Sequence, residues 1–446
     1  MALNGSAPVY SPPVSNDVST ELDERSDDTT LDAAFSLAVL VSPDPALAGR
    51  VIPLADRLAI GRTGGDLVID DPKLSRAHAV LIRQPDGGYR VEDEKSANGT
   101  FVNGKRVRGR ELPAGTILRV GQTIFEVGPG DAPPTDFHRD PDLVGHSRPL
   151  RRLLDAIDRV AQRDIGVLIT GETGTGKELV ARRLHARSRR KGQLVAVNCA
   201  AVPAQLFESA LFGHRKGAFT DATADSVGYF GAAEGSTLFL DEVATLPLEL
   251  QPKLLRAIET REVTPVGTTT ARRCDVRLVA ASNVDLLRES AEGRFRRDLY
   301  ARLAEHRIDT PPLRRRRSDI PLLVRHFLNV LAPGQSFTES TGFLEELLIR
   351  DYPMNVRELR AAVQHAVLEA GEEGRLEASM LPPAPPPAAA APVDASSQHP
   401  SREELEAILA RHGGNLTLVA KHYGRARMQI YRWLEKYELN PSDYRT

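Results

Sequence analysis

The sequence has few cysteines and no long apolar run. Only Cys199 and Cys274 occur in 446 residues, and both stand in apolar surroundings, which favours a reducing compartment over a disulfide scaffold. No stretch of about 18 apolar residues is present, so a transmembrane helix is not predicted. The first residues lack the basic segment and apolar segment of a secretory signal. These absences favour a cytoplasmic protein with no membrane partner.

An excess of charge of one sign is also lacking. Lysine and arginine number 58 against 60 aspartates and glutamates, a formal net charge of −2, so any DNA binding must come from a local patch rather than from the global field. Apolar content of 41% and charged content of 26% are ordinary for soluble proteins. The chain is too long for one compact core, and about three domains are expected.

Shifts in composition divide the chain into six segments. The first residues are rich in Ser, Pro, Asp and Thr and nearly lack aromatics, so they do not bury enough apolar surface to fold. We expect a disordered acidic tail at 1–33, an all-β sandwich at 34–128, a linker at 129–141, an α/β domain with a helical lid at 142–378, a Pro/Ala linker at 379–400 and an all-α helix-turn-helix at 401–446. The predicted fold class is therefore multidomain.

Periodicity places the strands of the first two domains. Short alternating runs separated by Gly, Asp and Asn predict strands at Ser36–Val41, Asp56–Ile60, His78–Arg83, Tyr89–Asp93, Ile117–Val120 and Ile124–Val127. Further along, buried runs alternate with helices and predict parallel strands at Gly166–Thr170, Leu194–Asn198, Thr237–Leu240 and Val276–Ala280. Helices are expected from there to about Gly374.

A glycine-rich segment between a buried strand and a helix predicts a phosphate-binding loop. It comprises Gly171, Glu172, Thr173, Gly174, Thr175, Gly176, Lys177 and Glu178. Consecutive backbone N–H groups and the helix N-terminus suit a phosphate, and Lys177 would reach the β- and γ-phosphates. Glu178 stands where a hydroxyl residue usually follows the lysine.

An apolar run that ends in two acids predicts the second half of this site. After Leu238–Leu240, Asp241 is placed to hold Mg²⁺ through water, and Glu242 is placed to polarise the attacking water. Each motif alone has an alternative, an unrelated glycine-rich turn or a strand that ends in acids. In this order, the two together predict an ATPase with ATP and Mg²⁺ as cofactors.

Residues 142–375 resemble the central AAA+ domain of the NtrC-like sigma-54 activators, or bacterial enhancer-binding proteins. The GETGTGKE segment matches their Walker A, in which glutamate normally follows the lysine. The resemblance implies that Asn198 restrains the catalytic glutamate and that Asn283 is sensor I. It also implies that Arg296 and Arg302 reach a neighbouring subunit's nucleotide, which requires a ring, implied to be a hexamer. An arginine supplied in trans contributes about 10³–10⁵ in rate.

The segment Tyr352–Leu359 resembles the family's sensor II and implies that Arg357 contacts the nucleotide from the lid. The family usually has Trp-Pro-Gly-Asn here, so Tyr352 and Met354 depart from the pattern. For each of the three arginines the alternative is a solvated surface charge, which is the better interpretation of an arginine outside such a segment.

One loop resembles the GAFTGA loop that the family raises from the ring to contact sigma-54. It consists of Gly217, Ala218, Phe219, Thr220, Asp221 and Ala222. An exposed Phe219 suits an interface anchor, and Thr220 offers a hydroxyl. Asp221 replaces the family's glycine, and aspartate tolerates unusual backbone angles. The implied partner is sigma-54 RNA polymerase holoenzyme; the alternative is a motor-like domain that has lost or altered this contact.

Three motifs near the N-terminus resemble those of FHA domains in order and spacing, over about residues 35–128. They are Ile60–Arg62, Leu74–His78 and Ser96–Gly104. FHA domains are β-sandwiches with phosphothreonine-binding loops at one end, and guanidinium and hydroxyl groups suit a phosphate. The resemblance implies phosphothreonine binding by Arg62, Ser75 and Asn98, with Arg76 as a further candidate. It implies that His78 braces the loops.

This front domain implies a phosphothreonine protein as partner and regulation by a Ser/Thr kinase. Thr29-Thr30 in the tail is a candidate phosphorylation site in cis. The alternative is a vestigial sandwich that binds nothing.

The last segment resembles the Fis-type DNA-binding domain that ends most members of the family. Helices are predicted at Ser401–Arg411, Leu416–His422 and Arg427–Tyr437. The candidates for contact with base edges in the major groove are Arg427, Met428, Gln429 and Arg432. Lys421 and Arg425 are candidates for phosphate contact. A dimeric tail would bind inverted repeats in upstream enhancer DNA, and the alternative is a three-helix packing module.

Together these features predict a sigma-54-dependent transcription activator. Its AAA+ ring would hydrolyse ATP and remodel the closed polymerase complex to the open complex, under control of phosphothreonine recognition. One alternative is an ATP-gated DNA-binding regulator that does not remodel sigma-54. Another is a kinase-signalling adaptor that works through FHA docking and tolerates loss of Lys177 and Asp241.

Overall fold

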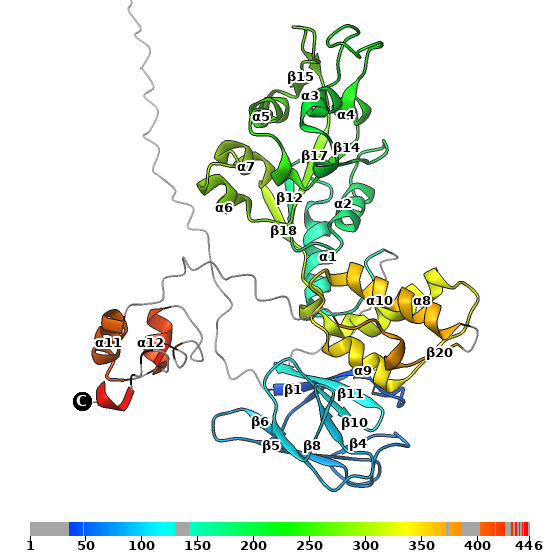
Figure 1. Cartoon of the computed structure of the whole chain (residues 1–446), viewed down its shortest axis with the longest axis vertical. Helices are drawn as coiled ribbons and strands as arrows, with labels where there is room; N and C mark the ends of the chain where they lie inside the picture. Colours follow the sequence, from blue (N-terminus) through cyan, green and yellow to red (C-terminus); the bar gives the residue numbers. More distant parts are fainter. Residues whose placement is uncertain are drawn as a thin grey trace, which may run out of the picture. The chain divides into compact units, whose positions relative to one another are not determined.

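The computed structural model describes residues 35–47, 49–129, 142–371, 374–384, 402–414 and 416–423, together with 430, 433, 434, 437, 439 and 441–444. They form two compact units, one up to Leu381 and one from Pro382 (Figure 1). The predicted tail at 1–33, including Thr29-Thr30, and most of both predicted linkers lie outside the described residues.

The first part of unit 1 is a sandwich of two sheets. The sheet of order β2-β1-β11-β10-β7-β8 contains β1 (Phe35–Val41), β2 (Val51–Pro53), β7 (Thr100–Val102), β8 (Lys105–Val107), β10 (Thr116–Val120) and β11 (Thr123–Pro129). The sheet of order β4-β3-β5-β6-β9 contains β3 (Arg57–Gly61), β4 (Leu67–Val68), β5 (Ala79–Arg83), β6 (Tyr89–Asp93) and β9 (Gly109–Glu111). Alternate residues such as Leu37, Val39, Leu81, Val91 and Phe125 form the core between the sheets. The six strands predicted from alternation are confirmed.

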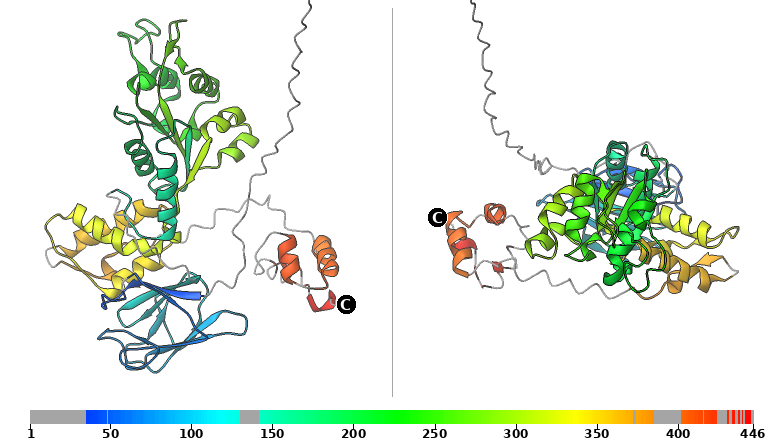
Figure 2. Two further views of the ribbon diagram at one scale, coloured as in Figure 1. Left: turned by 180° about the vertical axis from the view of Figure 1, so that it is seen from behind. Right: turned by 90° about the horizontal axis from the view of Figure 1, so that it is seen from above.

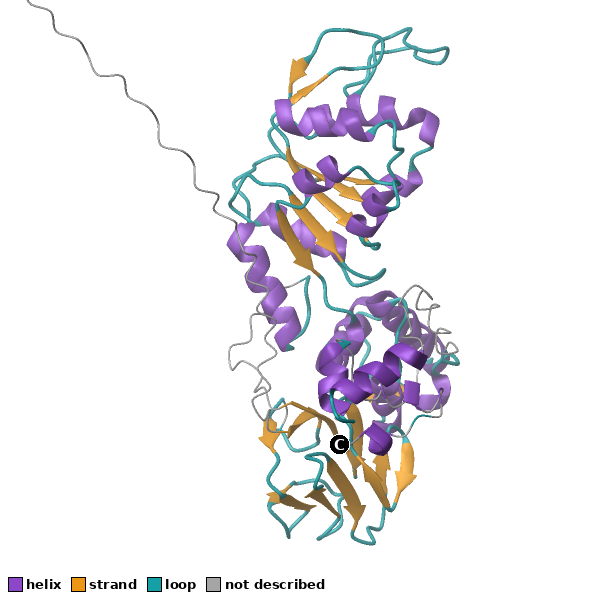
Figure 3. Cartoon of the chain, turned by 90° about the vertical axis from the view of Figure 1, so that its left-hand side faces the viewer, coloured by secondary structure: helices purple, strands orange, loops and turns teal. Residues whose placement is uncertain are grey.

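The second part of unit 1 is a parallel five-stranded sheet of order β13-β14-β17-β12-β18. Its strands are β12 (Val167–Thr170), β13 (Val195–Asn198), β14 (Thr237–Asp241), β17 (Arg277–Ser282) and β18 (His306–Asp309). The four predicted parallel strands are confirmed, and β18 was not predicted. Leu238 and Leu240 belong to one apolar cluster and Phe239 to another, so both faces of the sheet are covered (Figure 3).

Helices surround this sheet, and the phosphate loop and the loop at 217–222 lie next to them. They are α1 (Arg148–Val160), α2 (Lys177–Ala186), α3 (Ala204–Phe212), α4 (Gly228–Ala232), α5 (Gln251–Thr260), α6 (Leu286–Ala291) and α7 (Arg297–Leu303). A short antiparallel pair, β15 (Glu262–Val263) and β16 (Arg272–Arg273), follows α5. Cys199 and Cys274 are free and buried, and burial raises the pKa of both thiols to about 12.

The lid is a helical bundle around an apolar cluster that also includes Ile117 and Ile124 of the sandwich. It contains α8 (Ile320–Leu331), α9 (Thr341–Ile349) and α10 (Asn355–Ala370), with a parallel pair of β19 (Thr338–Glu339) and β20 (Arg375–Leu376). Figure 2 shows these yellow and orange helices gathered together. Phe343, Leu347, Tyr352 and Leu359 are at most 1% exposed, so they belong to the buried part of this cluster.

Unit 2 contains α11 (Arg402–Arg411) and α12 (Leu416–His422) around a small core. The buried side chains of this core include Leu405, Ile408, Leu409, Val419, Ala420, Ile430 and Leu434. Trp433 is buried there as well. Of the third predicted helix, Ile430, Trp433, Leu434 and Tyr437 are helical within the described positions.

Candidate functional site

The predicted phosphate loop lies at the carboxyl end of β12 and opens α2. Gly174 has a φ of +78°, and a Cβ there would come within 2.1 Å of the Met354 carbonyl oxygen. Only glycine therefore lets the loop approach the lid this closely. Next to it lies a pocket of about 380 Å³, a size suited to a small ligand. Its lining includes Thr173, Gly174, Thr175, Gly176, Lys177, Glu178, Asp241, Glu242, Arg316, Arg357 and Arg360.

Lys177 and two carboxylates meet in this pocket. Lys177 is 7% exposed, and its Nζ donates to the carbonyl oxygens of Gly171 at 2.9 Å and Glu172 at 3.4 Å. Burial lowers the pKa of Lys177, while Glu242 and Asp241 oppose that shift. Burial raises the pKa of Glu242, with Lys177 acting against it. The pocket thus holds the Lys177 ammonium group near a carboxyl group, that of Glu242, which binds its proton more tightly than usual.

Asn198 and Asn283 lie at the carboxyl ends of β13 and β17, the two strands that flank β14 in the sheet. Asn283 follows β17, and its Nδ2 donates to Thr173 Oγ1 at 3.4 Å, so it faces the phosphate loop. Asn198 ends β13 and lies in register with Asp241 on β14. Its Oδ1 accepts from the Ala200 N–H at 2.9 Å, capping the short turn that follows. Among the described contacts, none joins the Asn198 side chain to Glu242.

The lid supplies one wall of the pocket, including residues that the sequence analysis missed. Arg357 lines it as expected, together with Arg360 from the next turn of α10. Arg316 is 5% exposed, and its Nη2 donates to the Thr175 carbonyl oxygen at 3.3 Å. The run of four arginines at 314–317 is a sequence signal that could have indicated it.

Asn355 connects the lid to the phosphate loop by hydrogen bonds. It is fully buried, its Nδ2 donates to Glu172 Oε2 at 3.1 Å and to the Thr173 carbonyl oxygen at 3.0 Å, and its Oδ1 accepts from the Leu313 N–H at 2.8 Å. Arg314 pairs with the Glu172 carboxylate at 2.6 Å, and this hydrogen bond is the main cause that lowers the pKa of Glu172. The Glu172 side chain therefore serves the lid contact.

The departures from the family's sensor II turn are accommodated by the backbone. Met354, where the family has glycine, has a φ of −99°, which any residue adopts. The left-handed positions are Tyr352 and Asn355, with φ of +52° and +53°. The Tyr352 hydroxyl donates to the Leu347 carbonyl oxygen at 2.8 Å inside the lid core.

Arg296 and Arg302 do not line the nucleotide pocket of their own chain. Arg296 pairs with Asp298 at 2.6 Å, and Arg302 pairs with Glu259 at 3.2 Å. Their side chains are 43% and 52% exposed. Both are therefore presented on the surface of the ATPase domain.

The loop at 217–222 is a compact turn between α3 and α4. The Gly217 N–H donates to the Ala222 carbonyl oxygen at 2.8 Å, and the Ala222 N–H to that of Phe219 at 2.9 Å. Phe219 is 37% exposed, with its ring centre 4.9 Å from that of His214. Asp221 is not among the residues of positive φ, so the turn does not need the family's glycine there. Asp225 pairs with Arg215 at the base of the loop.

The predicted phosphothreonine residues gather on adjacent loops at one end of the sandwich. The Arg62 N–H donates to the Ser75 carbonyl oxygen at 2.9 Å, and Ser75 Oγ accepts from the Ala97 N–H at 3.0 Å. Asn98 Nδ2 donates to the Lys73 carbonyl oxygen at 2.6 Å. Arg62, Arg76 and Asn98 are exposed. These loops thus present two guanidinium groups, a hydroxyl and an amide on one surface.

His78 braces these loops as predicted. Its Nδ1 accepts from the Ser75 N–H at 3.1 Å, which leaves Nε2 to donate to the Gly99 carbonyl oxygen at 3.2 Å. Burial lowers the pKa of His78, which keeps this neutral tautomer. Position 61 must be glycine for these loops to come this close, since a Cβ there would lie 2.0 Å from the Arg76 carbonyl oxygen.

The predicted base-contacting residues Arg427, Met428, Gln429 and Arg432 lie outside the described residues. No helix in the described part of the chain is long and apolar enough to cross a bilayer.

The donor set of the pocket fits the magnesium ion of a nucleotide complex. Mg²⁺ binds through one or two carboxylates together with phosphate oxygens and water. Asp241 ends β14 inside the pocket, and Glu242 is next to it. These carboxylate oxygens suit the ion only when a ligand supplies the remaining coordination positions.

The comparisons with known families agree with this geometry. Residues 143–309 match the sigma-54 interaction domain, residues 314–397 the AAA+ ATPase lid domain, and residues 58–121 the FHA domain. The chain thus contains a region similar to the sigma-54 interaction domain, followed by an AAA+ lid and preceded by an FHA domain.

Individual relatives define the family further. The transcriptional regulatory protein ZraR of Klebsiella oxytoca is 47% identical over 305 residues, covering 66% of this chain and 68% of its own. The C4-dicarboxylate transport transcriptional regulatory protein DctD of Rhizobium meliloti is 40% identical over 306 residues, covering 68% of this chain and 65% of its own. A crystal structure of NtrX from Brucella abortus is similar with a TM-score of 0.51 and 33% identity, over 67% of this chain and 70% of that one.

This chain belongs to the family of sigma-54-interacting transcriptional regulators that includes ZraR. It spans just under two thirds of the length of DctD. NtrX has also been solved in complex with ADP, and that structure is similar with a TM-score of 0.50.

Proposed function

We propose that this protein is a sigma-54-dependent transcription activator whose AAA+ domain hydrolyses ATP to convert the closed polymerase complex to the open complex. The observation that carries the proposal is the pairing of two features in one domain. A pocket contains Lys177 opposite Asp241 and Glu242, and a half-exposed Phe219 stands at the tip of a GAFTGA-like loop.

Each pocket residue has its own role in hydrolysis. Lys177 neutralises the phosphates, and Glu242 accepts a proton from the water that attacks the γ-phosphorus, so that ADP and phosphate leave. Asp241 would hold Mg²⁺, which supplies charge neutralisation at the phosphate oxygens when bound. Arg357 would contact the phosphates from the lid, and Asn283, which contacts Thr173 of the phosphate loop, would orient the water.

Hydrolysis would be completed between subunits of a ring. Arg296 and Arg302 are exposed and do not line their own pocket, which supports a role at the neighbour's nucleotide. Assembly into a homo-oligomer, from dimer to hexamer, is therefore part of the proposal.

The FHA domain would supply the regulatory input. Arg62, Ser75, Arg76 and Asn98 would bind a phosphothreonine protein, the product of a Ser/Thr kinase, and the helix-turn-helix would hold the activator on upstream enhancer DNA. The six-segment division of the chain given above would then separate sensing, motor and DNA binding. A cytoplasmic location fits these partners.

A trapping experiment tests the sigma-54 contact. Full-length protein is mixed with purified sigma-54 and either ATP, ADP or a transition-state analogue of ATP, ADP with aluminium fluoride. We expect co-migration with sigma-54 only with the analogue, and loss of the complex in Lys177→Ala. If ATP is hydrolysed and no nucleotide state retains sigma-54, the ATP-gated DNA-binding regulator is the better account, with Asp221 as the cause.

A further inference from the structure

The FHA sandwich packs against the lid through a shared apolar core. Ile117 on β10 and Ile124 on β11 are at most 1% exposed and belong to the cluster that contains Phe343, Leu344 and Leu347 of α9. Strand β10 lies directly against α9. Two isoleucines of the sandwich are therefore buried by the lid.

A buried ion pair lies in this interface. Arg119 Nε donates to Glu345 Oε2 at 2.7 Å, with side chains 16% and 8% exposed. The same guanidinium lies 3.6 Å above the Phe101 ring and donates to the Gly121 carbonyl oxygen at 3.2 Å. A buried charge needs such partners, so the pair fixes the orientation of the sandwich on α9.

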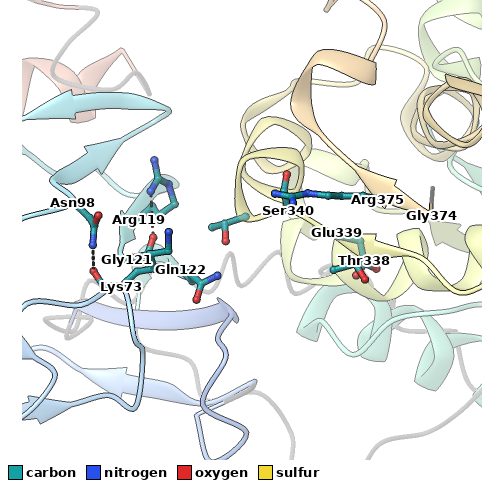
Figure 4. A pocket seen from close by; sticks show the side chains of 11 residues that line it. Lys73, Asn98, Arg119, Gly121, Gln122, Thr338, Glu339, Ser340, Gly374 and Arg375 are labelled. Carbon is teal, nitrogen blue, oxygen red and sulfur yellow. Dashed lines mark hydrogen bonds between the residues drawn. The ribbon is translucent and has the colours of Figure 1, made fainter. Parts of the chain in front are cut away.

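This orientation places the Asn98 loop opposite the lid. A pocket of about 560 Å³ lies between them (Figure 4). Its FHA wall is formed by Lys73, Asn98, Arg119, Gly121 and Gln122, and its lid wall by Thr338, Glu339, Ser340, Thr341, Gly374 and Arg375. Asn98 is thus both a predicted phosphothreonine ligand and part of a cavity that extends to the lid.

The charges of the pocket suit an acidic peptide. Arg119 is neutralised by Glu345, which leaves Lys73 and Arg375 against Glu339. Arg375 is 71% exposed and pairs with Glu377 at 2.6 Å, and an exposed pair of this kind is easily exchanged. The Thr341 hydroxyl on the lid wall adds a donor for carboxylate or backbone groups.

We propose that the lid forms the second wall of the phosphopeptide site, so that the pocket between Asn98 and Arg375 receives acidic residues next to the phosphothreonine. This inference rests on the proposed phosphothreonine recognition by the FHA domain. It identifies the ligand as a phosphothreonine peptide with a neighbouring acidic residue. It also connects the ligand to the motor, because the same lid carries Arg357 into the nucleotide pocket.

A peptide-library experiment on the full-length chain tests the proposal. The probe is a degenerate library of phosphothreonine peptides, with the unphosphorylated library as control. We expect wild type to enrich phosphorylated peptides with Asp or Glu near the phosphothreonine. Arg375→Glu should weaken binding of the best peptide at least fivefold and shift enrichment towards Lys and Arg. Arg325→Glu, an exposed charge reversal on α8 outside the pocket, should change neither.

Two outcomes separate failure of the inference from failure of the function on which it rests. If wild type binds phosphorylated peptides and Arg62→Ala abolishes binding, but Arg375→Glu changes neither affinity nor selection, the lid is not part of the site. If wild type does not distinguish phosphorylated from unphosphorylated peptides, phosphothreonine recognition is itself wrong and the inference fails with it. Melting temperatures of both charge reversals should match wild type, which excludes unfolding as the cause.

Discussion

At the residue scale, the chemistry depends on a few side chains whose burial changes their ionisation. Glu242 directly follows β14, and burial raises the pKa of its carboxyl, although the nearby Lys177 lowers it. A carboxylate that accepts a proton from water must be ionised before the reaction. Acid should therefore inactivate this ATPase at a higher pH than an ordinary glutamate would give.

The first prediction concerns this ionisation. The value of kcat/KM for ATP should fall on the acid side with an apparent pKa above the ordinary glutamate value of about 4.3. Glu242→Gln should abolish hydrolysis, whereas Glu249→Gln, an exposed acid in the same domain, should leave the profile unchanged. A pH profile of kcat/KM is the measurement, and an acid limb at or below about pH 4.3 would contradict the assignment.

Local motifs made part of the site predictable from sequence. Lys177, Asp241 and Glu242 lie in short sequence motifs, and such a motif is enough to predict where each residue lies. The structure brings these three residues into one pocket with Arg357. Arg316 and Asn355 were not predicted as site residues. Their roles depend on how the lid packs on a loop about 140 to 180 residues earlier in the chain, which no local pattern encodes.

At the element scale, the sequence predicted long, regular elements better than short ones. Strand β6 has five residues that alternate between buried and more exposed positions, whereas β2, β7, β8 and β9 have three residues each. Such short strands exist because neighbouring strands pair with them, and pairing is not visible in one segment. Strand β18 was also missed, since three of its four residues, His306–Asp309, are polar and only Ile308 is apolar.

The second prediction concerns the junction between the lid and the phosphate loop. Asn355→Ala removes three hydrogen bonds from a buried residue and places alanine at a φ of +53°. Because unsatisfied buried groups cost about 1–3 kcal/mol each, we expect a lower melting temperature and a KM for ATP raised about tenfold, equivalent to about 1.4 kcal/mol.

The control for this prediction is the neighbouring residue. Met354 is 42% exposed with a φ of −99°, so Met354→Gly should leave KM unchanged. Equal effects of the two substitutions would show that Asn355 has no special role.

The third prediction concerns the loop at 217–222. Phe219→Ala removes the half-exposed aromatic ring while the turn bonds between Gly217 and Ala222 remain. ATP hydrolysis should stay within about twofold of wild type, and promoter opening should be lost. Asp221→Gly restores the family's residue and should retain both activities. Loss of ATPase activity in Phe219→Ala, or normal promoter opening, would contradict a role confined to contact with sigma-54.

At the scale of the whole molecule, one chain does not contain a complete catalytic site in the proposed mechanism. Arg302 is 52% exposed and lies away from its own pocket, paired with Glu259 and Glu305. Surface pairs of this kind contribute little to stability, so Arg302 is free to change partner when a neighbouring subunit presents ATP.

The fourth prediction uses mixtures of inactive subunits. Lys177→Ala lacks a working pocket but keeps Arg302, and Arg302→Ala keeps the pocket but lacks the arginine. Each alone should lose at least about 10³ in rate, while the mixture should regain measurable hydrolysis because one variant completes the other's site. Arg297→Ala, an exposed neighbour, should be active by itself. A mixture no more active than its components would contradict action in trans.

The most direct measurement of the central claim is open-complex formation at a sigma-54 promoter. Full-length protein is added to holoenzyme bound in the closed complex, and strand separation is followed with ATP or with a non-hydrolysable analogue. The account predicts opening with ATP alone, and none with the analogue or with Lys177→Ala. If ATP is hydrolysed at a normal rate and the promoter stays closed, this chain is not a sigma-54 activator.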